Sequence, residues 1–546
     1  MWVRSSWLGR GISWLLALLL LVGVTTGCRT DGGDSFGFSL SAEPQQIDPQ
    51  VARDTASLTV IAAVFEGLTS LDENGEPVPA AATWTVSEDR LIYTFNIRES
   101  YWSTVTVRGE ETGFEDPVMV TAHDFVFGFR RTADPTTGSP YADLLSGIVN
   151  ASEVLAGQKP STALGVQATD DSTLIIRLSA PDPDFPKKLA SPGFMPCSRE
   201  FFAYTSGRYG LEPKYILTNG AFSVSGWEHD KSVSLVKNPH YHAAKDVLPA
   251  SVRYRIPTAE QTDFELLTKE YLDLATVSVD QLEDAKEAGL TLVELQDTVR
   301  FLWINNEVET LGNPDIRRAL RDAIEYESLW EALPDGCIPA TGFIPPAATV
   351  TGGKSFREEQ NRLPFSADPT AATAALSKGL EALELEKMPT VTLLAAEDDN
   401  SANFARYILQ SFTKNLGVRC TLELTDPETL NARVAAGNYQ LAIADVTPRG
   451  LSAYENLSMF TSGAPANNFA RFSSVDFDRR YHAAGDHPAS VKALEGELYE
   501  TVPAVPLGFV TRYYGMLPEV TGVTVRPFFG GKYGDWLSFR RADRNE

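Results

Sequence analysis

Residues 391–446 have the sequence VTLLAAEDDN SANFARYILQ SFTKNLGVRC TLELTDPETL NARVAAGNYQ LAIADV, and this stretch decides the fold class. The apolar run 391–396 is typical of a buried strand. Apolar residues then recur at helical spacing from Phe404 to Leu416, and Gly417 ends the helix. The first third of the stretch therefore predicts a strand followed by a helix.

The rest of the stretch repeats that order. Alternation of apolar and polar residues over 418–424 predicts a second strand, and Asp426 with Pro427 predicts the start of a second helix. Residues 439–446 return to a strand pattern. Strands that alternate with helices predict a mainly parallel sheet with right-handed crossovers, so we expect Cys420 to face a core.

Outside this stretch the same patterns predict further elements. Alternation predicts strands at 36–40, 91–97 and 173–178. Asn313 and Pro314 have the residue types that cap and begin a helix, and the apolar stripe that follows predicts a packed face.

Composition limits the function. At roughly 150 residues per domain, the 546 residues predict two to four domains. The 47 Lys and Arg against 72 Asp and Glu give a net charge of -25, which repels nucleic acid. The 4 cysteines and 6 histidines are too few for a disulfide scaffold or an elaborate metal centre.

The N-terminus has the features of an export signal. Arg4 and Arg10 precede the apolar run 14–22, which has the length of a secretory signal core. The following Val24-Thr25-Thr26-Gly27-Cys28 resembles the lipobox of bacterial lipoproteins, although Thr25 stands where Leu is usual. We expect 1–27 to be a signal peptide and 28–34 a tether with lipid on Cys28, the alternative being an ordinary signal peptide with an incidental Cys.

Motifs for catalysis are missing. The sequence has no G-x-S-x-G and no H-E-x-x-H, and its nearest phosphate-loop candidate has Ala348 where the first Gly is required. The pair His240 and His242 follows a strand pattern at a turn, which favours a surface loop over a metal edge. We therefore expect that the protein is not an enzyme and that it binds neither a cofactor nor a metal ion.

An ordered series of short segments runs through the whole mature chain. The series comprises 43–49 (EPQQIDP), 64–68 (VFEGL), 79–84 (PAAATW), 93–98 (YTFNIR), 120–125 (VTAHDF), 134–142 (DPTTGSPYA), 164–166 (LGV), 219–222 (NGAF) with Trp227, 237–241 (KNPHY), 305–306 (NN), 317–320 (RRAL), 415–418 (NLGV) and 505–507 (VPL). In this series the chain resembles the extracytoplasmic solute-binding proteins of the oligopeptide and dipeptide ABC importer family.

The resemblance implies a type II periplasmic-binding-protein-like α/β fold, with two lobes around a ligand cleft and a small extra domain. The implied hinge strands lie near 297–300 and 500–504. The implied domains are domain I (35–66, 172–296 and 503–546), the small domain II (67–171) and the α/β domain III (297–502).

The resemblance also implies the function. The chain would be a monomeric, lipid-anchored component of an ABC importer at the extracytoplasmic face of the cell envelope. It would bind peptides, expected to be oligopeptides, in a closing cleft, without catalysis, and deliver them to a membrane permease. The alternatives are a peptide sensor or chaperone-like protein without a transporter, and a binder of a non-peptide ligand.

One departure concerns the ligand amine. Members of the family typically carry a Trp-Cys-x-Asp segment whose Asp pairs with the peptide's α-ammonium, and its three defined positions correspond here to Thr447, Pro448 and Gly450. Either Asp445 or Glu455 could take the place of that Asp. The ligand contacts implied by the resemblance are Asn219, Gly220, Trp227, Phe301, Arg433, Asp445, Glu455 and Phe509.

Two further features stay open. Cys197 and Cys337 both lie beside Pro in expected loops, and export permits a disulfide between them. The segment 105–117 replaces a short turn of the family and is expected to be a surface insertion of the small domain, with no assigned role.

Overall fold

The structure is a computed structural model of the chain. It describes residues 35–40, 42–72, 75–103, 105–107, 110–112, 118–258, 261–358, 361–448, 450–463, 468–527 and 534–542. The predicted signal peptide, tether and lipidated Cys28 lie outside these residues, as does much of the 105–117 segment. None of the helices within the described ranges is long and apolar enough to cross a membrane.

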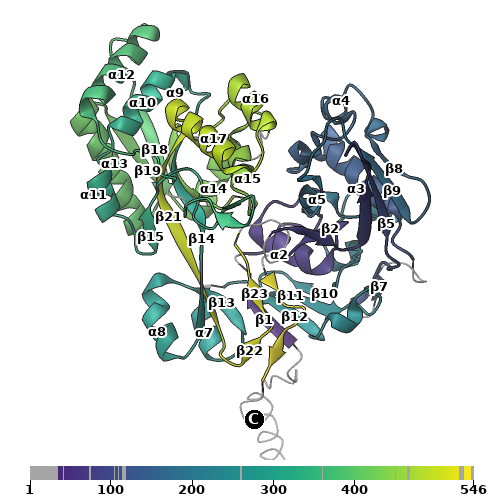
Figure 1. Cartoon of the computed structure of the whole chain (residues 1–546). Coiled ribbons are helices and arrows are strands. Elements are labelled where there is room, and N and C mark those ends of the chain that lie inside the picture. The colour runs from purple at the N-terminus through teal and green to yellow at the C-terminus, as the bar shows by residue number, and fades with distance from the viewer. Residues whose placement is uncertain are drawn as a thin grey trace, which may run out of the picture.

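Two lobes stand on a common base (Figure 1). A large sheet runs from the base into the left-hand lobe in the order β10-β11-β12-β1-β13-β21-β14-β20-β18-β19, with β15 beside β21. Its strands are β1 (Ser35–Ser39), β10 (Phe222–Glu228), β11 (Ser232–Lys237), β12 (Ser251–Arg255), β13 (Leu274–Val277), β14 (Thr291–Ile304), β15 (Cys337–Pro339), β18 (Val391–Ala396), β19 (Cys420–Thr425), β20 (Leu441–Val446) and β21 (Ala504–Met516).

The long strands β14 and β21 join the base to the left-hand lobe (Figure 1). Their antiparallel register shifts between Leu295 and Thr298 and again between Arg300 and Phe301. The first hinge segment expected at 297–300 falls at these shifts. On β21 the facing residues are 506–512, later than the expected 500–504.

The left-hand lobe contains the β-α-β-α-β unit predicted from 391–446. β18 pairs in parallel with both β19 and β20, with α13 (Asp399–Leu416) and α14 (Pro427–Ala436) between them in sequence. Cys420 packs partly buried against the core, as expected. The other helices of this lobe are α9 (Glu309–Gly312), α10 (Pro314–Asp322), α11 (Tyr326–Glu331), α12 (Pro369–Ala382), α15 (Ala453–Asn456), α16 (Val475–Ala483) and α17 (Pro488–Thr501).

The right-hand lobe is built on a four-stranded sheet in the order β4-β5-β9-β8. β9 follows the domain boundary expected at 171/172 and pairs with both β5 and β8. The expected domain division stays a proposal. The elements of this lobe are β4 (Ala82–Val86), β5 (Ile92–Ile97), β8 (Val166–Ala168), β9 (Thr173–Arg177), α2 (Thr55–Val64), α3 (Ala122–Ala133), α4 (Ala151–Leu155), α5 (Phe185–Lys188) and α6 (Arg199–Thr205).

Short elements complete the fold. The base also holds α7 (Asp263–Thr268) and α8 (Leu282–Glu287), and the segment expected as an insertion forms the hairpin β6 (Val105–Val107) and β7 (Glu110–Thr112). The remaining strand pairs are β2 (Thr69–Leu71) with β3 (Pro77–Pro79), β16 (Thr349–Val350) with β17 (Lys354–Ser355), β22 (Val520–Thr521) with β25 (Arg540–Arg541), and β23 (Thr524–Val525) with β24 (Gly534–Asp535).

Burial of apolar side chains joins β1 to the segment around Trp536 in the base. Phe36 of β1 stacks on Trp536 with ring centroids 5.0 Å apart, and both side chains are buried. One continuous core fills the base and the right-hand lobe, and two more cores cover the faces of the left-hand part of the sheet. Each lobe thus has its own packed interior.

The possible disulfide between Cys197 and Cys337 is absent, and both are free thiols. Cys197 lies in the core shared by the base and the right-hand lobe, where its Sγ accepts a hydrogen bond from Arg131 Nη1 at 3.5 Å. Cys337 lies on β15, which pairs with β21, so the two cysteines belong to different parts of the fold.

Candidate functional site: a cavity between the lobes

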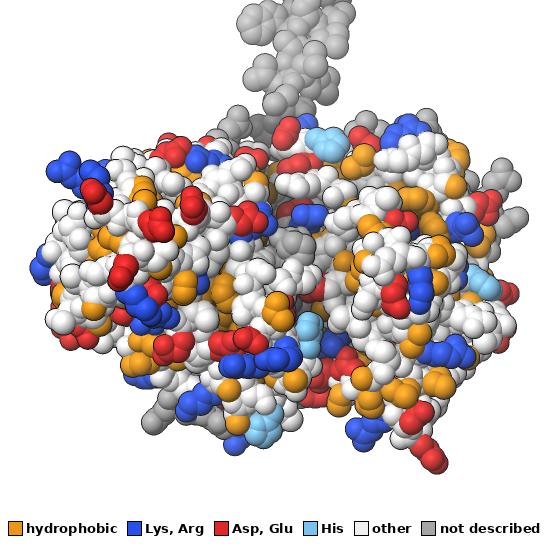
Figure 2. Space-filling model, turned by 90° about the horizontal axis from the view of Figure 1, so that it is seen from above, with side chains coloured by type: hydrophobic (Ala, Val, Ile, Leu, Met, Phe, Trp, Pro, Cys, Tyr) orange, Lys and Arg blue, Asp and Glu red, His pale blue; other side chains and the backbone are white. Residues whose placement is uncertain are grey.

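A cavity of about 280 Å³ lies between the two lobes and is walled by both. Figure 2, a view from above, shows the hollow between the two halves of the molecule. The right-hand lobe contributes residues of 141–155 and 184–192, together with Leu58 and Leu71. The left-hand lobe contributes residues of 450–463 together with Tyr481 and His482.

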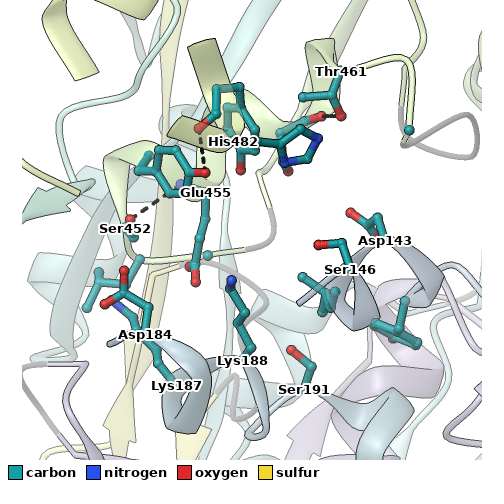
Figure 3. A pocket seen from close by; sticks show the side chains of 18 of the residues that line it. Asp143, Ser146, Asp184, Lys187, Lys188, Ser191, Ser452, Glu455, Thr461 and His482 are labelled. Carbon is teal, nitrogen blue, oxygen red and sulfur yellow. Dashed lines mark hydrogen bonds between the residues drawn. The ribbon is translucent and has the colours of Figure 1, made fainter. Parts of the chain in front are cut away.

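The short helix α5 presents the charges of the right-hand wall. Phe185 and Pro186 are buried at its start, and the Phe185 ring contacts Tyr93 with centroids 5.1 Å apart. With this face of the turn fixed in the core, Lys187 and Lys188 lie on the cavity side (Figure 3). Lys188 Nζ donates a 2.6 Å hydrogen bond to Asp182 Oδ2 in an ion pair.

The short helix α15 presents the opposite wall. Ser452 caps it by accepting a 3.3 Å hydrogen bond from Glu455 N, and Ala453 is buried beneath it. Tyr454 stacks on Tyr481 with centroids 4.4 Å apart and donates a 2.8 Å hydrogen bond to the Tyr481 carbonyl. These contacts leave the Glu455 side chain pointing across the cavity toward Lys188 and Asp184 (Figure 3).

Burial shifts the pKa values of two carboxyl groups at this site. Burial raises the pKa of Glu455, and the nearby Lys187 and Lys188 lower it by a smaller amount. Burial also raises the pKa of Asp486 to about 6, behind the same helix. Within the described part of the chain, neither the Glu455 carboxylate nor the Lys187 ammonium has a hydrogen bond or ion pair. Unpaired charges at a cavity wall are candidates for ligand contacts.

Gly450 makes room for the Glu455 carboxylate. A Cβ added at Gly450 would overlap with Glu455 Oε2 and would lie 3.0 Å from Glu455 Cβ. Glu455 therefore occupies the space that any side chain at position 450 would fill. This is the position at which the resemblance predicts an aspartate.

Comparison with known proteins gives the family. The chain matches the model of the bacterial extracellular solute-binding proteins, family 5, over residues 76–468. The chain belongs to this family. Its fold agrees, because the structure of Listeria monocytogenes OppA bound to peptide superposes with a TM-score of 0.78 at 23% identity, covering 94% of this chain and 100% of that one.

Two relatives of known sequence differ in their named ligands. The dipeptide-binding protein of Lactococcus lactis subsp. cremoris is 27% identical over 540 residues, covering 94% of this chain and 96% of the relative. The probable deoxycholate-binding periplasmic protein YgiS of Escherichia coli K12 is 26% identical over 544 residues, covering 96% of both. Both relatives are binding proteins by name.

One of the ligand contacts predicted for this family member, Glu455, lies in the cavity wall. Asp445, the other candidate carboxylate, is held on β20 by Arg300, whose Nε and Nη2 donate hydrogen bonds of 2.7 and 2.9 Å to its two oxygens. Arg300 thus already balances the charge of Asp445. Of the two carboxylates, Glu455 lines the cavity and Asp445 does not.

Asn219 and Gly220 bind the chain's own backbone. Asn219 Nδ2 donates a 2.9 Å hydrogen bond to the Glu66 carbonyl, and its Oδ1 accepts one of 3.1 Å from Glu66 N. Gly220 N donates to the Val64 carbonyl at 2.9 Å, and an added Cβ would lie 2.6 Å from Val64 C. The close approach expected here is therefore to the end of α2, and Gly220 does not adopt a positive φ.

The four remaining predicted contacts stay predictions, and none of them lines the cavity. Trp227 is buried in the base and donates a 2.7 Å hydrogen bond from Nε1 to Glu43 Oε1. Phe301 and Phe509 are buried in the core beneath α15. Arg433 forms an ion pair with Glu423, with a 2.5 Å hydrogen bond from Nη1 to Oε1.

Sequence reasoning missed the right-hand wall and the tyrosine pair. Lys187 and Lys188 lie in the four-residue α5, which is too short to show a helical period. Their only sequence signal is two adjacent lysines beside Pro186 and two nearby acids, Asp182 and Asp184. That pattern is common on surfaces. His242, of the candidate metal pair, donates a 2.8 Å hydrogen bond from Nε2 to Glu66 Oε2. No group of three possible metal ligands occurs among the described residues.

Proposed function

We propose that the protein is the peptide-binding component of an ABC importer, and that the cavity between the lobes holds the peptide with its α-ammonium on Glu455. The observation that carries this proposal is the unpaired carboxylate of Glu455 at the wall of an interlobe cavity. Family membership supports a solute-binding role. The named ligand of the Lactococcus lactis relative supports peptides.

The chemistry of the wall fits an ammonium ligand. A cation placed against Glu455 would supply the countercharge that the desolvated carboxylate lacks, which makes the ionised form favourable again. Tyr454 and Tyr481 flank this carboxylate and offer apolar ring faces to a peptide side chain. Binding that contacts both lobes would hold them together, and the closed complex is the form that a permease would accept.

A second candidate is a binder of a non-peptide carboxylic acid. The named ligand of the Escherichia coli relative and the unpaired Lys187 at the cavity wall favour it. Such a ligand would use the lysine and the tyrosine faces and leave Glu455 without a partner.

The test is ligand recovery from the purified chain lacking residues 1–27. The protein is incubated with a mixed library of di- to pentapeptides and with bile acids, and native mass spectrometry identifies bound species. We expect intact peptides with free amines, and we expect Glu455→Gln to lose them while Glu381→Gln, an exposed carboxylate of α12, keeps them. Recovery of bile acids alone, or of cleaved peptides, would contradict the proposal.

Anchoring is a separate part of the proposal. Cys28 would carry lipid after removal of 1–27 and hold the protein at the extracytoplasmic face of the membrane beside its permease. Wild type should then partition into the detergent phase and Cys28→Ala should not. Equal partitioning would remove the anchor and leave the binding function intact.

A further inference from the structure

The acidic and basic residues lining the cavity are Asp143, Asp184, Lys187, Lys188, Glu455 and His482. Of these, Glu455 and Lys187 carry opposite charges on opposite lobes. Glu455 belongs to α15 of the left-hand lobe and Lys187 belongs to α5 of the right-hand lobe. Among the described residues neither charge has a hydrogen bond or an ion pair, whereas the adjacent Lys188 is paired with Asp182 at 2.6 Å. Lys187 also acts electrostatically on both Glu455 and Asp486, lowering the pKa of each.

A ligand with a single charge would leave either Glu455 or Lys187 without a partner. A cation on Glu455 leaves the Lys187 ammonium in a cavity that the ligand has emptied of water, and an anion on Lys187 leaves Glu455 in the same position. An unpaired charge in a desolvated site costs more than a paired one gains. A ligand carrying both charges satisfies both walls at once.

The size of the cavity limits how far apart those ligand charges can be. Its volume of about 280 Å³ lies just below the usual range of ligand pockets, which is about 300–1,000 Å³. A long peptide would place its carboxylate outside this space. A short peptide has both termini within it.

We propose that Lys187 binds the carboxylate terminus of the ligand while Glu455 binds its amine, so that the cavity selects short peptides with both termini free. This inference rests on the proposed peptide-binding function. It assigns the right-hand lobe a direct part in ligand recognition. Asp184 lines the cavity on the same turn as Lys187, and no hydrogen bond or ion pair of its carboxylate occurs within the described ranges (Figure 3). Its negative charge disfavours a ligand with a second carboxylate there.

The test uses three probes, namely the tripeptide Ala-Phe-Ala, its C-terminal amide and its N-acetyl derivative, titrated calorimetrically into the mature chain. We expect wild type to bind the free tripeptide at least about 10-fold more tightly than either blocked form. Lys187→Gln should lose the preference for the free carboxylate and keep the preference for the free amine. Glu455→Gln should do the reverse, and Lys187→Arg should restore the wild-type pattern.

Matched controls separate recognition from general effects. Lys159→Gln removes a lysine of the same lobe that is paired with Glu153 on the surface, and it should leave all three affinities unchanged. An equal loss of affinity for all three probes in Lys187→Gln would show that Lys187 only attracts the opposite lobe, which overturns the inference.

The remaining outcomes separate the inference from the function it rests on. If wild type binds none of the three probes but the library yields longer peptides, the short-ligand inference fails and the peptide-binding function stands. If the library also yields no peptide, the function itself fails.

Discussion

At the scale of single residues, the site depends on which of positions 450 and 455 supplies a side chain to one space. A side chain is missing at Gly450, and the Glu455 carboxylate fills the space it would take. The sequence alone shows a missing aspartate and two carboxylates nearby, so it predicts a choice between Asp445 and Glu455. It cannot show that Arg300 pairs with Asp445, because these residues are 145 positions apart in the chain.

Gly450→Ala tests this exchange. The added methyl group overlaps with Glu455 Oε2, and because this atom ends a flexible side chain we expect the carboxylate to move out of the cavity. Affinity for Ala-Phe-Ala should fall about as far as in Glu455→Gln, with little change in the urea midpoint of unfolding. The double variant should bind no more weakly than either single variant. Wild-type affinity in Gly450→Ala would show that the carboxylate does not need this space.

The raised pKa of Asp486 should change how the stability of the protein depends on pH. Burial raises this pKa to about 6 from the ordinary value of 3.8, with Glu455 and Lys187 as the charged groups facing Asp486. Between these two values the folded state binds more protons than the unfolded state, so this group makes the protein less stable as the pH rises from about 4 to about 6. Asp486→Asn should therefore be more stable than wild type at pH 7.5, and this difference in stability should be smaller at pH 4.5. If the two proteins differ by the same amount in urea midpoint at both pH values, this expectation is wrong.

At the scale of elements, long periodic segments were predictable and short ones were not. The β-α-β-α-β unit and the strands near 36–40, 91–97 and 173–178 are confirmed, because each has a clear apolar period and turn residues at its ends. The helices α5 and α15 have four residues each, which is too short to show a helical period, and buried residues of each helix hold it in place. The cavity lies between these two helices, which is why its walls could not be foreseen.

The helix α10 offers a test of what local sequence contributes. Asn313 Oδ1 accepts hydrogen bonds of 2.8 and 3.3 Å from Asp315 N and Ile316 N, and the predicted apolar stripe is fully buried. Asn313→Ala leaves these amides without that partner, and we expect a loss of about 1 kcal/mol in the free energy of unfolding. Asn313→Ser, which keeps an acceptor, should lose less in urea denaturation. Equal losses in the two variants would show that tertiary packing alone holds this helix.

At the scale of the whole molecule, one sheet carries the connection between base and left-hand lobe. β14 and β21 bridge the two, and the register shifts near 295–301 interrupt their pairing midway. Beside these shifts Asp297 on β14 accepts a 3.0 Å hydrogen bond from Arg512 Nε on β21. Strand pairing is therefore weakest where the chain passes between the two bodies, and a side-chain ion pair joins the strands there. This combination permits bending without separation of the strands.

Lobe closure on a bound peptide is the expected consequence. Because the cavity is walled by α5 on one side and α15 on the other, a peptide contacts Glu455 and Lys187 together only when the lobes are close. Saturating Ala-Phe-Ala should therefore lower the radius of gyration measured by small-angle X-ray scattering, without a change in molecular mass. At about 100 times the Kd it should also raise the free energy of unfolding by about 2.7 kcal/mol. Lys187→Gln should show less compaction than wild type at equal saturation, because its right-hand wall has lost the ligand contact, while Lys159→Gln should match wild type. A radius of gyration that stays constant as the peptide saturates would mean that the lobes are already together in the free protein, and that recognition at Lys187 does not drive closure.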